Sequence, residues 1–478
     1  MIGLGHSPQF ALQNFLAQRG IKDLTGRSIF YLEAAAFESQ AGQNWKNEIP
    51  DEWKRLTLEE FGQLPLDDFS ISFYKPGLRL FPSFYGPLRA KIQALGLKQS
   101  FSVHKKSLTA IVAGDETGLL ITEISESLRD LNLQVLRINP EEIAHSLPQI
   151  IRKCPPDLFL SVNLAGFDPL GEIYYLFKEL DIPCASWLVD NPWHILSKLR
   201  ASFWKEMHLF VTDVSFISQL KSAGAKSAHH LPLAANPKMF KPNQNDADLD
   251  MVFAGRSEFP NRNKFFAAAK VPQNLLEEAK KATLEGNVRD FNWWLKRLEI
   301  SKFWPGQEVR KAGLGAETCS LAWRTACIRT ALQPEYSFKL FGNKEWLDQM
   351  PELGERLNPP LDYYHALPAA YASAKIVLST TSLLLPEGLN QRHFDAWMAG
   401  SICLTDNTPG LKIFPPELAR PTAYSHPDDI PHLCQELLNH NSLRDELKSG
   451  WSALLLNEHT YRHRMEAMLK VIGLQKAS

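Results

Sequence analysis

From residue 107 onward, short apolar runs alternate with segments of helical periodicity. The run LTAIVAG is followed by the amphipathic stretch ITEISESLRDL and then by QVLRIN, and the pattern continues through DLFLSVN, CASWLVD and LFVTD. Short, uniformly apolar runs separated by helices are typical of parallel strands joined by crossover helices. The alternation therefore predicts a doubly wound, Rossmann-like α/β domain over residues 101–245.

A second alternation of the same kind begins at DMVFAG and resumes in SFKLFG, KIVLSTT and SICLTD. A stretch rich in Lys, Glu, Ala and Trp interrupts it and predicts a helical insertion over residues 265–333. We therefore expect a second Rossmann-like domain over residues 246–458, followed by a C-terminal helix over residues 459–478. Ligands of such sheets bind at the carboxyl ends of the strands, so two tandem domains predict a cleft between those ends.

Residues 1–100 are less regular. Gly3 and Gly5 open a helical stretch, and the apolar run SIFYLE then ends at Glu33, an order that imitates the start of a nucleotide-binding unit. Almost no chain precedes Gly3 to form a first strand. We therefore expect a partial α/β segment and give little weight to a ligand site there.

The overall composition excludes several classes of function. The 478 residues include 52 Lys+Arg and 53 Asp+Glu, a formal net charge of −1, which argues against a nucleic-acid partner. No apolar run approaches the roughly 18 residues of a membrane span, and MIGLGHSPQF does not have the pattern of a signal peptide. We expect a cytoplasmic protein without a transmembrane segment; peripheral membrane association stays open. The six cysteines form no C-x-x-C pair, so no metal site is predicted.

The segment after KIVLSTT contains the most candidate site residues. Glu387 and Gly388 lie at the loop end, and Asn390 is a candidate helix cap. Asp395 follows Glu387 by eight residues, which is roughly 12 Å along a helix. That span suits one carboxylate on a sugar and the other on a ribose, with a diphosphate between them. The alternative is two solvated acids on a helix surface.

The end of the run DMVFAG supplies positive charge. Gly255 and Arg256 close that run, and Arg262 follows six residues later. Two guanidinium groups on one cleft loop can hold a diphosphate through bidentate hydrogen bonds. An exposed basic loop is the alternative.

The C-terminal block resembles a known family. The motif Gly388-Leu389-Asn390-x-Arg392-x-Phe394-Asp395-Ala396, the later Leu404-Thr405-Asp406 and the run LPAAYASAKIVLSTT carry the resemblance. They resemble the glycosyltransferase group 1 family, in particular its spore-maturation CgeB-like branch. The resemblance covers residues 330–470 well and residues 150–260 loosely.

The resemblance implies a GT-B fold, a nucleotide-diphosphate sugar as donor and no further cofactor. The family has a Glu-x7-Glu pattern where this chain has Glu387 and Asp395. It implies that Glu387 contacts the transferred sugar, that Asp395 contacts the ribose, and that Arg256 and Arg262 contact the diphosphate. The shorter Asp395 puts its reach to the ribose in doubt. The donor-binding residues expected in this way are Gly255, Arg256, Arg262, Glu387, Gly388, Leu389, Asn390, Arg392 and Asp395.

The first Rossmann-like domain is then expected to bind the acceptor. Asp190 ends the run CASWLVD and His194 follows it, so either could act as general base if the reaction inverts configuration, or position the acceptor if it retains it. A helix cap and a packed histidine are the structural alternatives. Asn163 and Asp213 are weaker candidates at neighbouring strand ends.

The leading hypothesis is a glycosyltransferase of the hexosyltransferase type, active in glycan biosynthesis. It would transfer a sugar to a glycan, a lipid-linked glycan or a protein. A nucleotide-sugar epimerase and a catalytically inactive GT-B scaffold remain as alternatives, since a fold alone does not fix a function.

Overall fold

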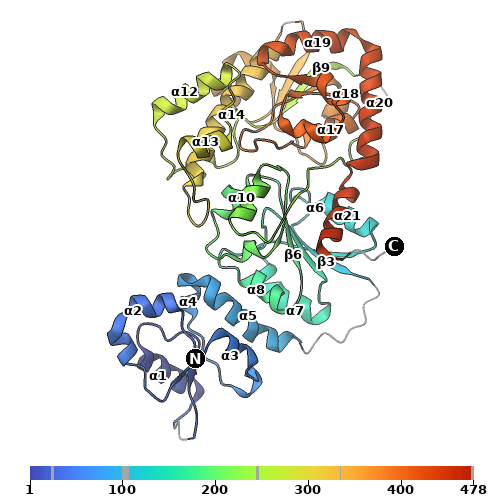
Figure 1. Ribbon diagram of the computed structural model, residues 1–478. Helices are drawn as coiled ribbons and strands as arrows, with labels where there is room; N and C mark the ends of the chain where they lie inside the picture. Colours follow the sequence, from blue (N-terminus) through green and yellow to red (C-terminus); the bar gives the residue numbers. More distant parts are fainter. Residues whose placement is uncertain (23–25, 99–106, 244–246, 334, 475–478) are drawn as a thin grey trace.

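The structure is a computed structural model that describes residues 1–22, 26–98, 107–243, 247–333 and 335–474. Figure 1 shows a small N-terminal part in blue, a central α/β domain mostly in green, and a second α/β domain in orange and red. Each of the two larger domains contains a parallel sheet of six strands. The predicted α/β class is therefore confirmed, as is the arrangement of two Rossmann-like domains with an extra N-terminal segment.

The central domain has the strand order β4-β3-β5-β6-β7-β8. Every residue of β3, β5 and β6 is buried, because helices cover both faces of the sheet, and this explains why these runs are uniformly apolar. The strands are β3 (Thr109–Ala113), β4 (Gln134–Ile138), β5 (Leu158–Val162), β6 (Cys184–Leu188), β7 (His208–Val211) and β8 (Ser227–His230). The helices are α6 (Ile121–Asp130), α7 (Ile143–Lys153), α8 (Glu172–Glu179), α9 (Pro192–Leu196) and α10 (Phe216–Ser222).

The second domain has the order β11-β10-β9-β12-β13-β14, so the chain reverses direction across the sheet between β9 and β12. Ligands of doubly wound sheets bind at such a reversal. The strands are β9 (Leu249–Ala254), β10 (Phe338–Phe341), β11 (Leu357–Asn358), β12 (Ala374–Ser379), β13 (Ile402–Asp406) and β14 (Ala423–Tyr424). The helices after β10 are α15 (Trp346–Gln349), α16 (Leu367–Ala372), α17 (Arg392–Met398), α18 (Pro416–Ala419), α19 (Ile430–Asn439) and α20 (Asn441–Glu458).

The insertion between β9 and β10 contains α11 (Arg262–Phe265), α12 (Gln273–Leu284), α13 (Phe291–Arg297) and α14 (Val309–Ala331). In Figure 1 these yellow helices extend from the second domain down to the side of α10. The apolar residues of α14 divide between two cores. Those up to Cys319 pack into the core of the central domain, and those from Trp323 onward pack into the core of the second domain. One helix therefore ties the two domains together.

The C-terminal helix α21 (Tyr461–Ile472) also joins the domains. It follows α20 on the second domain but packs against α6 of the central domain, as Figure 1 shows. A parallel bridge pairs Ala235 with Thr460, and the guanidinium of Arg464 donates hydrogen bonds to the carbonyls of Pro232 and Leu233. Of the residues 459–478 expected to form the C-terminal helix, Tyr461–Ile472 are helical, and residues 475–478 lie outside the described part of the chain.

The N-terminal segment is a small parallel α/β unit. Its elements are β1 (Phe30–Tyr31), β2 (Lys54–Arg55), α1 (Pro8–Arg19), α2 (Ala35–Asn47), α3 (Leu58–Gln63), α4 (Lys75–Leu80) and α5 (Pro82–Lys98), and α5 packs against α8 of the central domain. Ile2 forms parallel bridges with Leu32 and Phe73. These are isolated bridges outside any strand, so no first strand precedes Gly3, as the sequence led us to expect.

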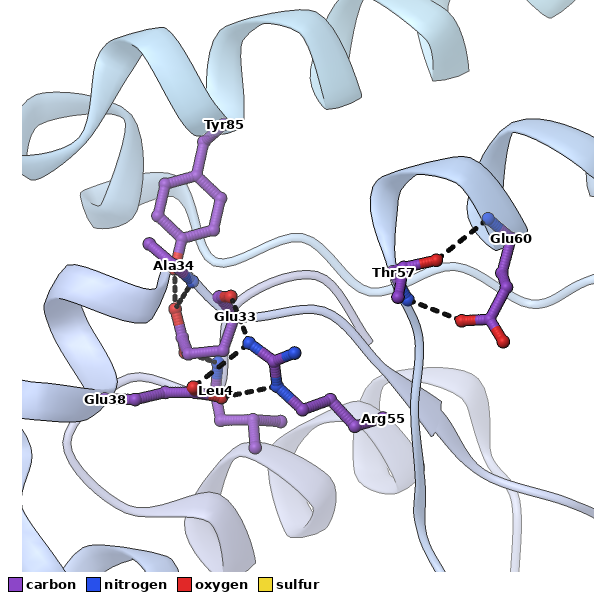
Figure 2. A network of polar contacts seen from close by, with 8 residues as sticks. All are labelled: Leu4, Glu33, Ala34, Glu38, Arg55, Thr57, Glu60 and Tyr85. Atoms are coloured by element: carbon purple, nitrogen blue, oxygen red, sulfur yellow. Dashed lines mark hydrogen bonds and ion pairs between the residues drawn. The ribbon is translucent and has the colours of Figure 1, made fainter.

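Glu33 follows β1 and anchors this unit, as Figure 2 shows. Its carboxylate accepts hydrogen bonds from the backbone N–H groups of Leu4 at 2.8 Å and Ala34 at 3.0 Å, and from the hydroxyl of Tyr85. Glu33 is only 2% exposed, and burial raises the pKa of its carboxyl. Its hydrogen bonds are made within the protein, which supports a structural role.

Candidate active site

A cavity of about 860 Å³ lies between the two domains. Four parts of the chain form its walls: the segment after β6, the segment after β9, helix α14, and the segment after β12. These place the cavity at the carboxyl ends of strands from both sheets. Its lining residues are Asp190, Asn191, His194, Ile195, Lys198, Arg256, Glu258, Phe259, Pro260, Asn261, Lys264, Phe265, Glu317, Arg324, Ser382, Leu384, Leu385 and Arg392.

Arg392 crosses the reversal point of the second sheet. Its Nε donates a hydrogen bond to the carbonyl of Ala254 at 2.9 Å, and its guanidinium carbon lies 5.2 Å from the centroid of the Phe253 ring. A Cβ atom on Gly255 would lie 2.7 Å from Arg392 Nη2. Glycine at position 255 therefore leaves the space that this arginine occupies. Arg392 itself lines the cavity, and Gly255 makes room for it because glycine has no side chain.

Arg256 and Arg324 bring two further guanidinium groups to the cavity. Arg256 is exposed at the end of β9, and Arg324 comes from α14. Arg324 Nη1 donates hydrogen bonds to the carbonyls of Arg256 at 3.1 Å and Ser257 at 2.6 Å, which fixes the loop after β9 against the helix. The sequence prediction missed Arg324 because it considered only residues near strand ends.

Arg262 lies beside the cavity and does not line it. Its Nε is 3.5 Å from the carboxylate of Glu258, and its Nη2 donates to the hydroxyl of Thr318 at 3.3 Å. Of the two arginines predicted from the sequence, Arg256 lines the cavity and Arg262 does not, whereas Arg324 and Arg392 do.

Glu387 and Asp395 face different surroundings. Asp395 is 1% exposed; its carboxylate accepts hydrogen bonds from the hydroxyl of Tyr363 at 3.0 Å and the amide of Gln391 at 2.9 Å. Burial raises the pKa of the Asp395 carboxyl well above its usual value. Glu387 lines a separate open groove between α10 and α13, and its backbone N–H donates to Asp213 Oδ2 at 3.0 Å. The Asp395 carboxylate is thus occupied by protein groups, while Glu387 faces a hollow other than the cavity between the domains.

The loop before α17 is held by its own side chains. Asn390 Oδ1 accepts a hydrogen bond from the backbone of Arg392 at 3.0 Å, and its Nδ2 donates to the carbonyl of Thr380 at 2.9 Å. Asn390 therefore fixes the turn before α17, but the predicted cap is one residue off, because the N-cap position is Gln391, whose side chain makes no capping hydrogen bond. Leu389 is buried, and a Cβ atom on Gly388 would lie 2.7 Å from the Cβ of Leu385. These residues shape the cavity wall through packing.

Asp190 lies on the opposite wall, at the end of β6. Its carboxylate is exposed and accepts a hydrogen bond from the amide of Asn163 at 2.8 Å. Desolvation by the surrounding protein raises the pKa of Asp190, while Asn163 and Lys198 oppose that shift. The structure thus brings the predicted Asp190 to the same cavity as the three arginines, and Asn163 orients it.

His194 borders the cavity, but its ring is packed among aromatic side chains. It is 8% exposed, and its ring lies against those of Phe265, Phe266 and Phe291, with centroids 5.1, 5.8 and 5.6 Å away. Burial lowers the pKa of His194 to about 3. A ring with so low a pKa is a poor general base at neutral pH. The predicted base role therefore does not suit His194 in this structure.

Hydrogen bonds between the domains hold the cleft together. The Asn191 amide of the central domain donates to the carbonyl of Leu384 in the second domain at 2.9 Å. Within the second domain, the backbone N–H of Phe291 in the insertion donates to the carbonyl of Leu383 at 2.8 Å. On the far side of the cleft, the hydroxyl of Tyr364 donates to the carbonyl of Gly118 at 3.0 Å. The weak candidate Asp213, 1% exposed, belongs to the same set of contacts through Glu387.

The described residues contain no group of three or more His, Cys, Asp or Glu side chains placed to hold a metal ion. In the same part of the chain, no helix is long and apolar enough to cross a membrane.

Comparisons with known proteins bear on the second domain. Residues 324–470 match a family model described as glycosyl transferase-like. The second domain is therefore similar to glycosyltransferase domains, in agreement with the resemblance of residues 330–470. The matched range is less than half of the chain. No curated protein matches this sequence.

Solved structures give distant likenesses. Anabaena HepE in complex with UDP and glucose has 10% identity and a TM-score of 0.46, over 77% of this chain and 100% of that chain. T4 phage BGT in complex with UDP-glucose has 10% identity and a TM-score of 0.43, over 77% and 99%. TarM has 9% identity and a TM-score of 0.38, over 66% and 54%. These likenesses are too distant to carry an argument about this chain.

Proposed function

We propose that this protein transfers a sugar from a nucleotide-diphosphate sugar to an acceptor in the cleft. One observation carries the proposal: Arg256, Arg324 and Arg392 meet on one cavity at the sheet reversal, and Asp190 faces the same cavity from the other domain. Three guanidinium groups suit a diphosphate, since each can donate two parallel hydrogen bonds. The similarity of residues 324–470 to glycosyl transferase-like domains supports the same reaction class.

In the proposed reaction, the bond between the anomeric carbon and the diphosphate oxygen breaks, and the bonding electrons leave with the diphosphate. The three arginines offset the charge that develops there. An acceptor hydroxyl oxygen forms the new bond to the anomeric carbon and gives its proton to Asp190. Its position favours this role, because Asp190 faces the arginines from the other wall of the same cavity and Asn163 holds its carboxylate in place.

The finer parts of the proposal follow from the resemblance. We propose a hexose as the transferred sugar, a glycan or protein as acceptor, membership of the CgeB-like branch, and a role in glycan biosynthesis in the cytoplasm. We also propose that the arginines neutralise the diphosphate without a metal ion.

Binding of nucleoside diphosphates tests the proposal. UDP, GDP and ADP at millimolar concentration are each added to the full chain, and thermal unfolding is followed, because a bound ligand raises the melting temperature. Arg256→Ala should weaken binding of the preferred nucleotide by about 10- to 100-fold, the usual range for charged hydrogen bonds. Arg462→Ala is the control, since Arg462 pairs with Glu466 on α21 outside the cavity. No stabilisation by any of the three nucleotides, or full affinity in Arg256→Ala, would overturn the proposal.

A further inference from the structure

Helix α14 presents one side to the cleft. Gly313, Glu317, Ser320 and Arg324 are spaced by four, three and four residues, so they share one face of the helix. Gly313 lies against His194, the hydroxyl of Ser320 accepts from the backbone N–H of Leu383 at 3.4 Å, and Glu317 and Arg324 line the cavity. Glu317 belongs to the insertion and lies before the range that matches the glycosyl transferase-like model.

The carboxylate of Glu317 has few partners within the protein. It is 2% exposed, and it accepts a hydrogen bond from the backbone N–H of Phe259. The arginines nearest to it, Arg324 and Arg262, act on it only through their charge, and no side chain of the described ranges forms an ion pair or a hydrogen bond with it. A buried carboxylate has about four acceptor positions. Because the Glu317 side chain lines the cavity, the remaining positions are open to a ligand there.

The surroundings of Glu317 indicate what kind of ligand supplies the missing donors. The cavity has guanidinium groups at Arg256, Arg324 and Arg392, which bind an anion, and it has Glu317 beside them, which binds hydrogen-bond donors. A ligand with a negative diphosphate next to hydroxyl groups satisfies both requirements. A nucleoside diphosphate alone satisfies only the first.

We propose that Glu317 accepts hydrogen bonds from hydroxyl groups of the transferred sugar and so selects the sugar of the donor. This inference rests on the proposed function and adds to it a residue that determines specificity. It places the contact on the insertion, whereas the sequence motif placed it on Glu387. Arg324 lies seven residues further along the same face and then binds the diphosphate. Helix α14 therefore contacts both the sugar and the diphosphate of the donor.

Paired binding measurements on Glu317→Gln test the inference. UDP-, GDP- and ADP-linked glucose are first compared on the wild-type chain, and the tightest donor and its free nucleoside diphosphate are then titrated by calorimetry. Glutamine keeps the shape of glutamate but removes the charge. Affinity for the nucleotide sugar should fall by about 10- to 100-fold, the range for hydrogen bonds to a charged group, while affinity for the nucleoside diphosphate should stay within about threefold.

Glu308→Gln is the matched control, because Glu308 precedes α14, is exposed and pairs with Lys311. Equal losses for both ligands in Glu317→Gln would show that Glu317 acts through the arginines, and unchanged affinity for both would show that it contacts no ligand. Either outcome overturns the inference while the proposed function stands. If the wild-type chain binds neither nucleotide sugar nor nucleoside diphosphate, the proposed function itself fails and the inference fails with it.

Discussion

Helix α14 packs closely against α9 at Gly313, and the substitution Gly313→Ala tests how tight this packing is. A Cβ atom at position 313 would lie 2.1 Å from Nε2 and 2.3 Å from Cε1 of His194, and 3.1 Å from Phe266. The ring of His194 cannot retreat, because Phe265 and Phe291 also pack against it. The new methyl group must therefore push α14 away from the central domain.

Two opposing effects determine how much Gly313→Ala changes the free energy of unfolding. Replacing a mid-helix glycine by alanine stabilises a helix by roughly 0.5–1 kcal/mol. Forcing an extra methyl group into a packed site costs typically about 1–3 kcal/mol. Gly313→Ala should therefore lower the free energy of unfolding by about 1 kcal/mol. Gly96→Ala on α5 is the control, because no atom lies within 4 Å of its new methyl group, and it should show only the stabilising effect.

Urea unfolding of the two variants measures the difference, which should approach about 2 kcal/mol. His194→Ala combined with Gly313→Ala adds a sharper test, because removing the ring makes room for the methyl group. In the His194→Ala background, Gly313→Ala should become stabilising, and the change of sign is a coupling energy between the two sites. Gly313→Ala that stabilises the chain as much as Gly96→Ala does, with His194 in place, would refute the packing described here.

The acid sensitivity of the fold should depend on His194, because its pKa is lowered from 6.5 to about 3 by burial. The unfolded chain takes up a proton below pH 6.5 and the folded chain does not, so stability present above that pH is lost as the pH falls toward 3. In His194→Leu, the free energy of unfolding, measured with urea at a series of pH values, should fall less steeply between pH 6.5 and 3. A pH dependence equal to that of the wild-type chain would contradict this prediction. Asp190→Asn should slow sugar transfer by about 10²- to 10⁴-fold while donor affinity is kept; Asp445→Asn on α20 is the control, and equal rates in both variants would exclude a base role.

The strands and their order of appearance could be predicted from the sequence because they are buried on both faces. Runs such as LTAIVAG and DMVFAG predict parallel strands in a sheet that helices cover on both faces. These runs form β3 and β9. Residues that follow a strand directly could also be placed, and Arg256 and Asp190 do line the cavity. In these cases a few neighbouring residues determine the position of the side chain.

The rest depends on contacts between distant parts of the chain. Asp395 has the sequence context of a ligand-binding residue, but its carboxylate accepts hydrogen bonds from Tyr363 and Gln391. No pattern in the residues around Asp395 predicts the hydrogen bond from Tyr363. Arg324 and Glu317 lie in the middle of α14, the long last helix of the insertion. Their place in the cleft follows from where that insertion folds, which is decided by packing against the central domain.

Because α14 is divided between two hydrophobic cores, it resists separation of the two domains. Up to Cys319 the helix is part of the central domain's core, and from Trp323 it is part of the second domain's core. Separating the domains along the cleft would require bending the helix between these residues or exposing one of its buried halves to water, and apolar burial opposes the second at roughly 25 cal/mol per Å². Because Glu317 and Arg324 lie on either side of that division, any such bend would also separate the proposed sugar and diphosphate contacts. The proposed function therefore implies that a donor contacting both residues binds most tightly when α14 is straight.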